Sequence, residues 1–291
     1  MNVVECKHIT KTWKDFSIKD VHFTIPKGYI TGFIGPNGSG KTTTIQLMMD
    51  LLRLDSGHIT LFGQPHTNNT VKQRIGFVYD DLFMYEDFTI KKMKAFIAPI
   101  YDNWNETLFN ELLERFELPV RKKLKTFSKG MKVKCSLLFA LAHEPELIIM
   151  DEPTAGLDPI FRKELLQILQ EIMIREGQTI FLSTHITSDL DNIADYVVLM
   201  NHGEVVFQQS IEEIKEQYHI IKGKKALLDS DIRSLFLHVE ETNSSFQALF
   251  KGNPKTFEPF DEEVIIETAT LDELMFFIVK GEKNDVATHQ T

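Results

Sequence analysis

The chain has 291 residues and a formal net charge of −10 with histidine neutral, and 43% of its residues are hydrophobic. This length suffices for one large hydrophobic core and a smaller second one. The negative charge argues against nucleic acid as a partner, because attraction to a phosphate backbone needs a basic face. No apolar run approaches the roughly 18 residues that span a bilayer, and the first residues lack a signal peptide's layout. We therefore expect a globular protein that stays in the cytoplasm.

Strand and helix patterns alternate along most of the chain. Residues 1–34 alternate as in a hairpin-rich sheet, and a glycine-rich loop then leads into an apolar helix. Strands that alternate with helices predict a parallel sheet with crossover helices, and so an α/β fold. The later expected elements are a turn, strand and turn within 56–64, a strand at 74–80 and a mainly helical region at 88–117. They are followed by a buried strand at 147–153, a helix at 161–175, a second buried strand at 179–185 and a hairpin at 196–209.

The pattern changes near residue 210, where a charged helix begins. Two strand-like segments follow, "IIKGKKALL" and "EEVIIET", and Thr270 is placed to cap a last helix. We expect a domain boundary near residue 215. It separates a domain at 1–215 from a small C-terminal α/β accessory domain at 216–291.

Residues 35–42, "GPNGSGKT", fit the phosphate-loop (P-loop) pattern GxxxxGK[ST] in full, with a strand before and a helix after. Glycines let backbone N–H groups face phosphate oxygens, and the helix N-terminus adds a favourable dipole. Lys41 is expected to reach the β- and γ-phosphates, and the Thr42 hydroxyl to ligate Mg²⁺. The predicted nucleotide-binding residues of this loop are Gly35, Asn37, Gly38, Ser39, Gly40, Lys41, Thr42 and Thr43.

Titratable residues follow two buried strands of the predicted sheet. Asp151 ends "LIIMD" and fits the acid that holds Mg²⁺, directly or through a water. The adjacent Glu152 can orient and partly deprotonate an attacking water. His185 ends "TIFLSTH", at the sheet edge where it can hydrogen-bond a γ-phosphate. The alternatives are a solvated strand end for the acids and a structural role for the histidine.

Four motifs in this order, "GPNGSGKTTT", "FSKGM", "LIIMDEPTAGLD" and "STH", resemble those of the ATP-binding subunit of ABC transporters. The resemblance covers roughly residues 1–215, and it is closest to bacterial drug and peptide exporters of the bacitracin-resistance and phenol-soluble-modulin type. It implies a P-loop NTPase fold with a mainly parallel central sheet, an antiparallel β part and a helical subdomain at about 88–145. It also implies ATPase activity with ATP and Mg²⁺.

By this resemblance, two subunits sandwich two ATP molecules, and each site joins the P-loop of one chain to the signature of the other. Ser128 and Gly130 are then expected at the γ-phosphate of the ATP held by the partner, with Ser128 capping a helix from about Lys129. The usual signature is LSGGQ, and this chain departs from it at Lys129 and Met131. The alternative is a solvated basic helix start.

Three further positions are carried over from the family. Trp13 falls near the aromatic that stacks on adenine, although Phe16 can serve instead and either can be core. Asp158 matches the loop that crosses between subunits. Asp80 stands where the family normally has Gln, and it can hold Mg²⁺ through water.

The expected partners are a separate membrane-spanning permease and a second ATP-binding subunit, identical or not. This places the chain at the cytoplasmic face of the cell membrane as a peripheral subunit of an exporter. Residues 88–104 are expected to contribute to the groove that receives the permease, or simply to pack as a helical subdomain. The alternatives are a soluble ABC ATPase in translation or DNA maintenance, and a regulator whose tail controls dimerisation.

Overall fold

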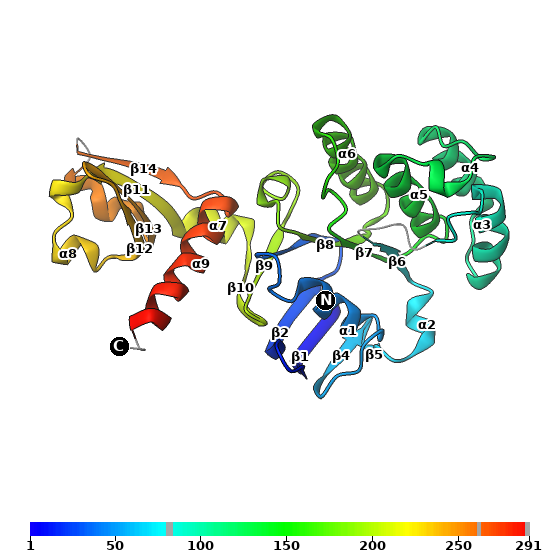
Figure 1. Ribbon diagram of the computed structural model, residues 1–291, viewed down its shortest axis with the longest axis horizontal. Coiled ribbons are helices and arrows are strands. Elements are labelled where there is room, and N and C mark those ends of the chain that lie inside the picture. Colours follow the sequence, from blue (N-terminus) through cyan, green and yellow to red (C-terminus); the bar gives the residue numbers. More distant parts are fainter. Residues whose placement is uncertain (80–83, 261–262, 289–291) are drawn as a thin grey trace. The chain divides into compact units, whose positions relative to one another are not determined.

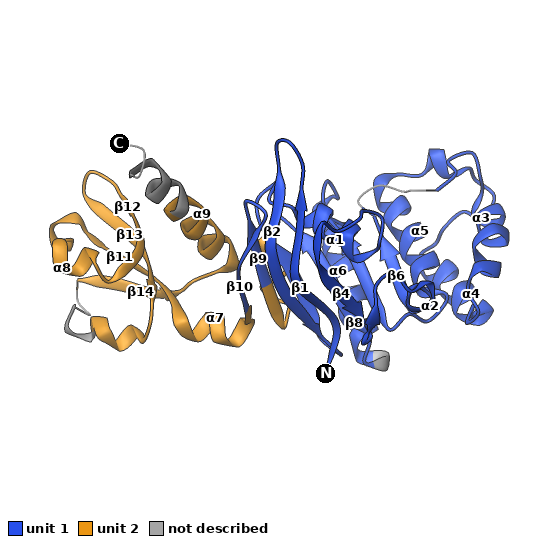
Figure 2. Cartoon of the chain, turned by 90° about the horizontal axis from the view of Figure 1, so that it is seen from below, with its two compact units in different colours: residues 1–186, 198–208 blue, residues 187–197, 209–291 orange. Residues whose placement is uncertain are grey.

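The computed structural model describes residues 1–79, 84–260 and 263–288, and the chain divides into two compact units (Figures 1 and 2). Unit 1 is Met1–Ile186 with Val198–Gln208, and unit 2 is Thr187–Val197 with Gln209–Thr291. The expected division into domains at 1–215 and 216–291 stays a prediction. The sequence did not indicate that Thr187–Val197 groups with the C-terminal part.

Unit 1 begins with an antiparallel sheet in the order β2-β1-β4-β5. In β2 the side chains of Val21, Phe23 and Ile25 are buried at every second position, which is the two-residue period of a strand with one face on the core. The strands are β1 (Asn2–Thr12), β2 (Ser17–Pro26), β4 (Ser56–Leu61) and β5 (Gln64–Pro65).

The second sheet of unit 1 has the order β10-β9-β3-β8-β7-β6, and the pairs β3–β8, β8–β7 and β7–β6 are parallel. Every residue of β3, β7 and β8 is buried, as expected for parallel strands covered on both faces. The mainly parallel central sheet is therefore confirmed. The strands are β3 (Ile30–Ile34), β6 (Ile75–Val78), β7 (Leu147–Asp151), β8 (Thr179–Thr184), β9 (Tyr196–Asn201) and β10 (Glu204–Ser210).

The core of unit 1 lies between these two sheets. Phe23 of the antiparallel sheet stacks on Phe33 and Phe181 of the parallel one, with ring centroids 5.5 and 5.9 Å away. All three rings are fully buried. Burial of such side chains, at about 1.5–3 kcal/mol each, fixes the sheet that carries the P-loop.

The helices of unit 1 begin and end where the sequence signals them. Asp158 accepts hydrogen bonds from the N–H groups of Ile160 and Phe161 and so caps α6, and Gly177 ends that helix in the left-handed region at φ 61°. The predicted end at Gly177 is confirmed. The helices are α1 (Lys41–Met48), α2 (Asn69–Lys72), α3 (Ile90–Ile97), α4 (Glu106–Arg115), α5 (Lys129–Leu141) and α6 (Pro159–Glu176), with 3₁₀ turns η1 (Ala98–Ile100) and η2 (Leu124–Thr126).

Unit 2 is built on an antiparallel sheet in the order β12-β13-β11-β14. On one face, Phe246 and Phe250 form a small core with Phe257, whose ring lies parallel to that of Phe236. The elements are η3 (Thr187–Asp189), α7 (Ile211–Gln217), β11 (Tyr218–Lys224), η4 (Lys225–Leu227), α8 (Ser230–Arg233), β12 (Phe236–Glu241), β13 (Ser245–Lys251), η5 (Pro254–Phe260), β14 (Val264–Thr268) and α9 (Leu271–Thr288).

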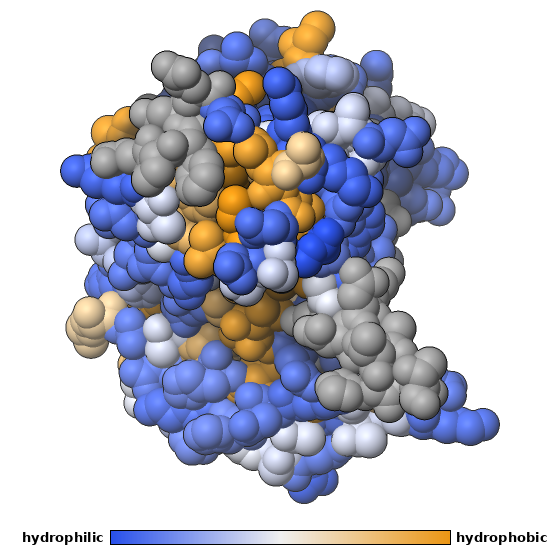
Figure 3. All heavy atoms as spheres, turned by 90° about the vertical axis from the view of Figure 1, so that its left-hand side faces the viewer, coloured by the Kyte–Doolittle hydropathy of each residue, from blue (hydrophilic) through white to orange (hydrophobic). Residues whose placement is uncertain are grey.

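Several apolar side chains of unit 2 remain exposed, among them Leu237, Ile265 and Phe276. Figure 3 shows hydrophobic residues gathered among polar ones on the face toward the viewer. Within the described ranges, none of the helices combines the length and apolarity that crossing a bilayer requires.

Candidate nucleotide-binding and catalytic site

The P-loop joins β3 to α1, and its glycines are needed for space as well as for conformation. A Cβ on Gly35 would lie 2.1 Å from the carbonyl oxygen of Met200, and Gly40 has φ 112° at the start of α1. The N–H of Gly203 donates to the Ser39 carbonyl over 2.9 Å. The P-loop therefore packs against the backbone of Met200 at its start and is hydrogen-bonded to Gly203 near its end.

Lys41, the first residue of α1, has its ammonium group almost completely removed from water, with 6% of its side chain exposed. Its Nζ donates to the Gly35 carbonyl over 2.8 Å and to the Pro36 carbonyl over 3.4 Å. Glu152 Oε1 lies 3.4 Å away. These contacts compensate a buried charge that would otherwise be costly.

The end of β7 carries two carboxylates with different surroundings. Asp151 is buried and pairs in register with Ser183 of β8, whose Oγ donates to Asp151 Oδ1 over 2.5 Å. The same Oγ accepts the N–H of Glu152 over 3.2 Å. Ser183 thus orients both acids. Sequence reasoning missed this role, although the position of Ser183 two residues before His185 was the available signal.

Glu152 lies between the P-loop lysine and the histidine at the end of β8. Its backbone is in the left-handed region at φ 49°, a conformation that costs free energy for a non-glycine residue. Oε2 is 2.7 Å from Nδ1 of His185 and also accepts that residue's backbone N–H over 3.2 Å. Glu152 therefore connects Lys41 to His185.

These groups border one cavity of about 580 Å³. Eight of the predicted site residues line it together: Asn37, Gly38, Gly40, Lys41, Thr42, Thr43, Glu152 and His185. Three further lining residues are Phe16, Lys129 and Ala155. The remaining predicted residues that the structure describes are not part of its lining: Trp13, Gly35, Ser39, Ser128, Gly130, Asp151 and Asp158.

The two aromatic candidates for adenine lie side by side. The rings of Trp13 and Phe16 are stacked with centroids 6.2 Å apart, and Lys11 Nζ lies 5.5 Å from the centre of the Trp13 ring. Phe16 contacts the cavity, whereas Trp13 does not line it. The geometry therefore favours Phe16, the alternative left open by the sequence.

The signature stands at the start of α5. Ser128 Oγ accepts the N–H of Met131 over 3.3 Å, so the predicted cap is confirmed. A Cβ on Gly130 would come within 3.0 Å of the Phe161 ring, so glycine lets α5 approach α6. The Lys129 ammonium extends over Gly156, where an added Cβ would lie 3.0 Å from Nζ.

The predicted Mg²⁺ site rests on oxygen donors. Thr42 is exposed and lines the cavity, and Asp151 supplies a carboxylate at the end of β7. Hydroxyl, carboxylate and phosphate oxygens are the ligands that Mg²⁺ prefers. Both residues fit this ion, and their role stays a prediction. Asp80, the third expected ligand, lies outside the described residues.

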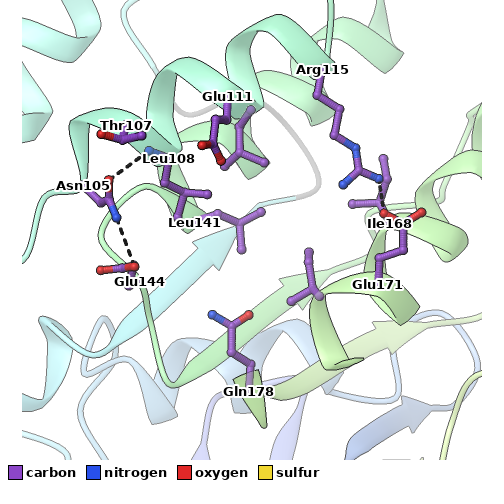
Figure 4. Close-up of a pocket in the computed structure, with 12 residues that line it drawn as sticks. Asn105, Thr107, Leu108, Glu111, Arg115, Leu141, Glu144, Ile168, Glu171 and Gln178 are labelled. Carbon is purple, nitrogen blue, oxygen red and sulfur yellow. Dashed lines mark hydrogen bonds and ion pairs between the residues drawn. The ribbon is translucent and has the colours of Figure 1, made fainter. Parts of the chain in front are cut away.

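A separate cavity of about 270 Å³ lies between α4 and α6 (Figure 4). Its rim includes the ion pair of Arg115 with Glu171, at 2.5 Å, and Asn105, whose side chain hydrogen-bonds Glu144 over 3.1 Å. Neither the P-loop nor the acids after β7 line it. This cavity is therefore distinct from the nucleotide site.

A parallel sheet, a P-loop between a strand and a helix, and acids at the end of another parallel strand define a P-loop ATPase. The ABC transporter family model matches residues 18–155. The chain is 33% identical over 227 residues to the ABC transporter ATP-binding protein YtrB of Bacillus subtilis, a match covering 78% of this chain and 76% of that protein. It therefore belongs to the ABC transporter ATP-binding proteins. The predicted ATPase activity is confirmed by membership of this family.

Two further similarities are informative. The chain is 31% identical over 220 residues to the bacitracin transport ATP-binding protein BcrA of Bacillus licheniformis, with 74% of this chain and 72% of that protein covered. A solved ATP-binding subunit of an ABC transporter superimposes with a TM-score of 0.66 at 28% identity, over 73% of this chain and 92% of that one. The expected fold class and the resemblance to bacitracin transporters are confirmed.

Proposed function

We propose that this subunit drives export of a peptide or drug through a separate membrane-spanning partner, by ATP-dependent closure of a dimer. The observation that carries the proposal is the convergence of Lys41, Glu152 and His185 on one cavity. Similarity to the bacitracin transport ATP-binding proteins supports export and the chemical class of the cargo.

ATP binding exchanges contacts that already exist within the protein. Lys41 leaves its carbonyl and Glu152 partners for the β- and γ-phosphates, which carry more negative charge. Backbone N–H groups of the P-loop and the start of α1 face the same phosphates. Because the loop is held in place beforehand, little ordering entropy is lost on binding.

Hydrolysis then needs an oriented water. Its oxygen attacks the γ-phosphorus, the bond from that phosphorus to the oxygen of the departing ADP breaks, and Glu152 accepts a proton from the water. His185, released from Glu152, hydrogen-bonds the γ-phosphate and keeps it in line. Thr42 and Asp151 would hold Mg²⁺, which would supply positive charge to the phosphates.

The second half of each site comes from the partner subunit. The capped N-terminus of α5 presents free backbone N–H groups and a positive dipole end, and the Lys129 ammonium adds a full charge. Within the described residues, Lys129 makes no ion pair or hydrogen bond, and it borders the P-loop cavity of its own chain. In the proposed dimer its ammonium therefore has to turn from this cavity to the phosphate held by the partner. Each ATP thereby contacts two chains and closes the dimer.

A groove of about 560 Å³ suits the membrane partner. Phe77 at the end of β6 lines it with residues of α3, and Tyr85 and Phe96 are each more than half exposed there. Some lining residues of the groove come directly before, and others directly after, the segment of the sequence that begins at Asp80. In this family, that position senses the permease. An apolar groove with aromatic walls fits a short amphipathic helix.

Affinity purification from solubilised membranes tests the choice of partner. A tagged subunit should carry with it one multi-spanning protein, and Phe96→Asp should abolish this recovery while leaving ATP binding intact. Asp229→Ala, on the surface of unit 2, is the matched control. Recovery of ribosomes or DNA-bound proteins in place of a membrane protein would contradict the export function.

A further inference from the structure

We infer that Lys129 binds the γ-phosphate of the ATP held by its own chain before the dimer closes, an inference that rests on the proposed function. Lys129 lines the P-loop cavity of the same chain, together with Lys41, Glu152 and His185. In the proposed dimer, the signature serves the nucleotide of the partner subunit. The contact within one chain is an additional one, and it belongs to the subunit that has not yet dimerised.

Lys129 reaches the cavity along Gly156, which carries no side chain. A Cβ on Gly156 would lie 3.7 Å from Cδ and Cε of Lys129 and 3.0 Å from its Nζ. An alanine at this position would therefore crowd the ammonium group, and Gly156 is also in the left-handed region at φ 66°. The neighbouring Ala155 lines the cavity as well. The lysine side chain thus passes over Gly156 where this loop meets the cavity.

The neighbours of Lys129 belong to the part of the cavity where we place the γ-phosphate. The Ala155 N–H donates to the Glu152 carbonyl over 3.1 Å, so residues 152–155 form a turn. Glu152 in turn contacts both Lys41 and His185, at 3.4 and 2.7 Å. Through this turn, Lys129 lies close to the groups that are expected to bind and cleave the terminal phosphate.

The charges on the cavity lining leave Lys129 available to an anion. The titratable groups of this lining are Lys41, Lys129, Glu152 and His185. Glu152 compensates Lys41, whereas Lys129 makes no ion pair or hydrogen bond within the described ranges. With histidine neutral, the lining thus has an excess of positive charge, although the whole chain carries −10. ATP, and not ADP, supplies a terminal phosphate that can pair with this ammonium group.

Nucleotide titrations of the monomer test the inference. They are made with EDTA, which prevents hydrolysis, and at a protein concentration where light scattering reports one chain. Lys129→Ala should bind ATP about fivefold more weakly than the wild type at low salt, and this difference should shrink at high salt. The affinity of the variant for ADP should be unchanged, because ADP has no γ-phosphate. Lys129→Arg keeps the charge and should bind both nucleotides as the wild type does.

Lys132→Ala is the matched control, since it removes another lysine near the start of α5, one that pairs with Glu86 and does not line the cavity. It should leave both affinities unchanged. Equal ATP affinity of the wild type and Lys129→Ala, an equal loss of ADP affinity, or an equal loss in Lys132→Ala overturns the inference. ATP titration of Lys41→Ala tells the two failures apart. If this affinity is unchanged as well, the proposed function fails, whereas a loss confined to Lys41→Ala overturns the contact of Lys129 alone.

Discussion

Lys41 combines contacts within the P-loop with a predicted role in nucleotide binding. Its buried ammonium group is compensated by two carbonyls and by Glu152, all within 3.4 Å. An ammonium group has three N–H donors, so it can bind a phosphate and a backbone carbonyl together. We therefore expect Lys41 to contribute both to the geometry of the P-loop and to nucleotide affinity.

We expect Lys41→Ala to weaken ATP binding ten- to hundredfold, because a hydrogen bond to a charged group contributes about 1.5–3 kcal/mol. Titration calorimetry with ATP measures this directly. Lys27→Ala, which removes an exposed lysine paired with Glu146, is the control and should bind normally. If Lys41→Ala binds ATP with unchanged affinity, the assignment of the P-loop to the nucleotide site is wrong.

Lys129 gives a second prediction at this scale. Replacing it with glycine, the residue usual in the family, removes a positive charge from the site while Ser128 still caps α5. We expect the dimer to form at higher ATP concentration and to depend less on salt, because one phosphate contact loses its charge. Lys129→Arg should behave as wild type. Identical salt dependence of the glycine variant and the wild type would show that Lys129 does not face a phosphate.

At the scale of elements, the sequence predicts the parts whose local pattern matches their final environment. The buried strands β7 and β8, the P-loop and the end of α6 at Gly177 were all predicted correctly, because burial on both faces and a left-handed glycine leave a local signature. The strands β12 and β13 were missed. β12 mixes apolar and charged residues around a bulge between Phe236 and His238, which breaks the two-residue period.

The sequence also predicted the part of the candidate site that is built from local motifs. Motif residues on β7, β8 and the P-loop were brought together as expected. Outside the site, the hydrogen bond from the Leu271 N–H to Asp191 in unit 2 was not predictable, because these residues are 80 positions apart and meet only in the folded chain. Long-range hydrogen bonds of this kind leave no periodic trace in a sequence.

The cap of α5 yields a prediction about an element. Ser128→Ala removes the bond to the Met131 N–H and should reduce the free energy of unfolding by about 1 kcal/mol. It should also weaken ATP-dependent dimerisation, since we propose that the same turn binds the partner's nucleotide. Ser210→Ala, which removes a comparable cap from α7, should lower stability alone. If both variants dimerise equally well with ATP, the start of α5 does not contribute to the nucleotide site.

At the scale of the whole molecule, unit 2 is not continuous in the sequence. Its segment Thr187–Val197 follows β8 along the chain and includes the first two residues of β9. Truncation near residue 215 removes α9 and exposes Leu190, which is fully buried in the whole chain. The truncated protein should still bind ATP, because no residue of the P-loop cavity lies beyond His185. It should dimerise or couple to the permease less well.

Truncated protein that melts cooperatively and binds ATP in a calorimeter would support an accessory role for unit 2. Insoluble truncated protein would contradict it, unless a point variant such as Leu190→Ser restores solubility without unit 2. If solubility returns and ATP binding does not, unit 2 is part of the ATPase core.

The mass of the Glu152→Gln variant in the presence of Mg²⁺ and ATP tests the central claim most directly. The charge that activates water is lost, whereas the P-loop and signature contacts remain, so turnover should fall by about 100-fold or more. Light scattering should then report twice the 33.6 kDa of one chain with ATP, and one chain with ADP. A monomer under both conditions, or hydrolysis at the wild-type rate, would contradict an ATP molecule held between two subunits and cleaved with the help of Glu152.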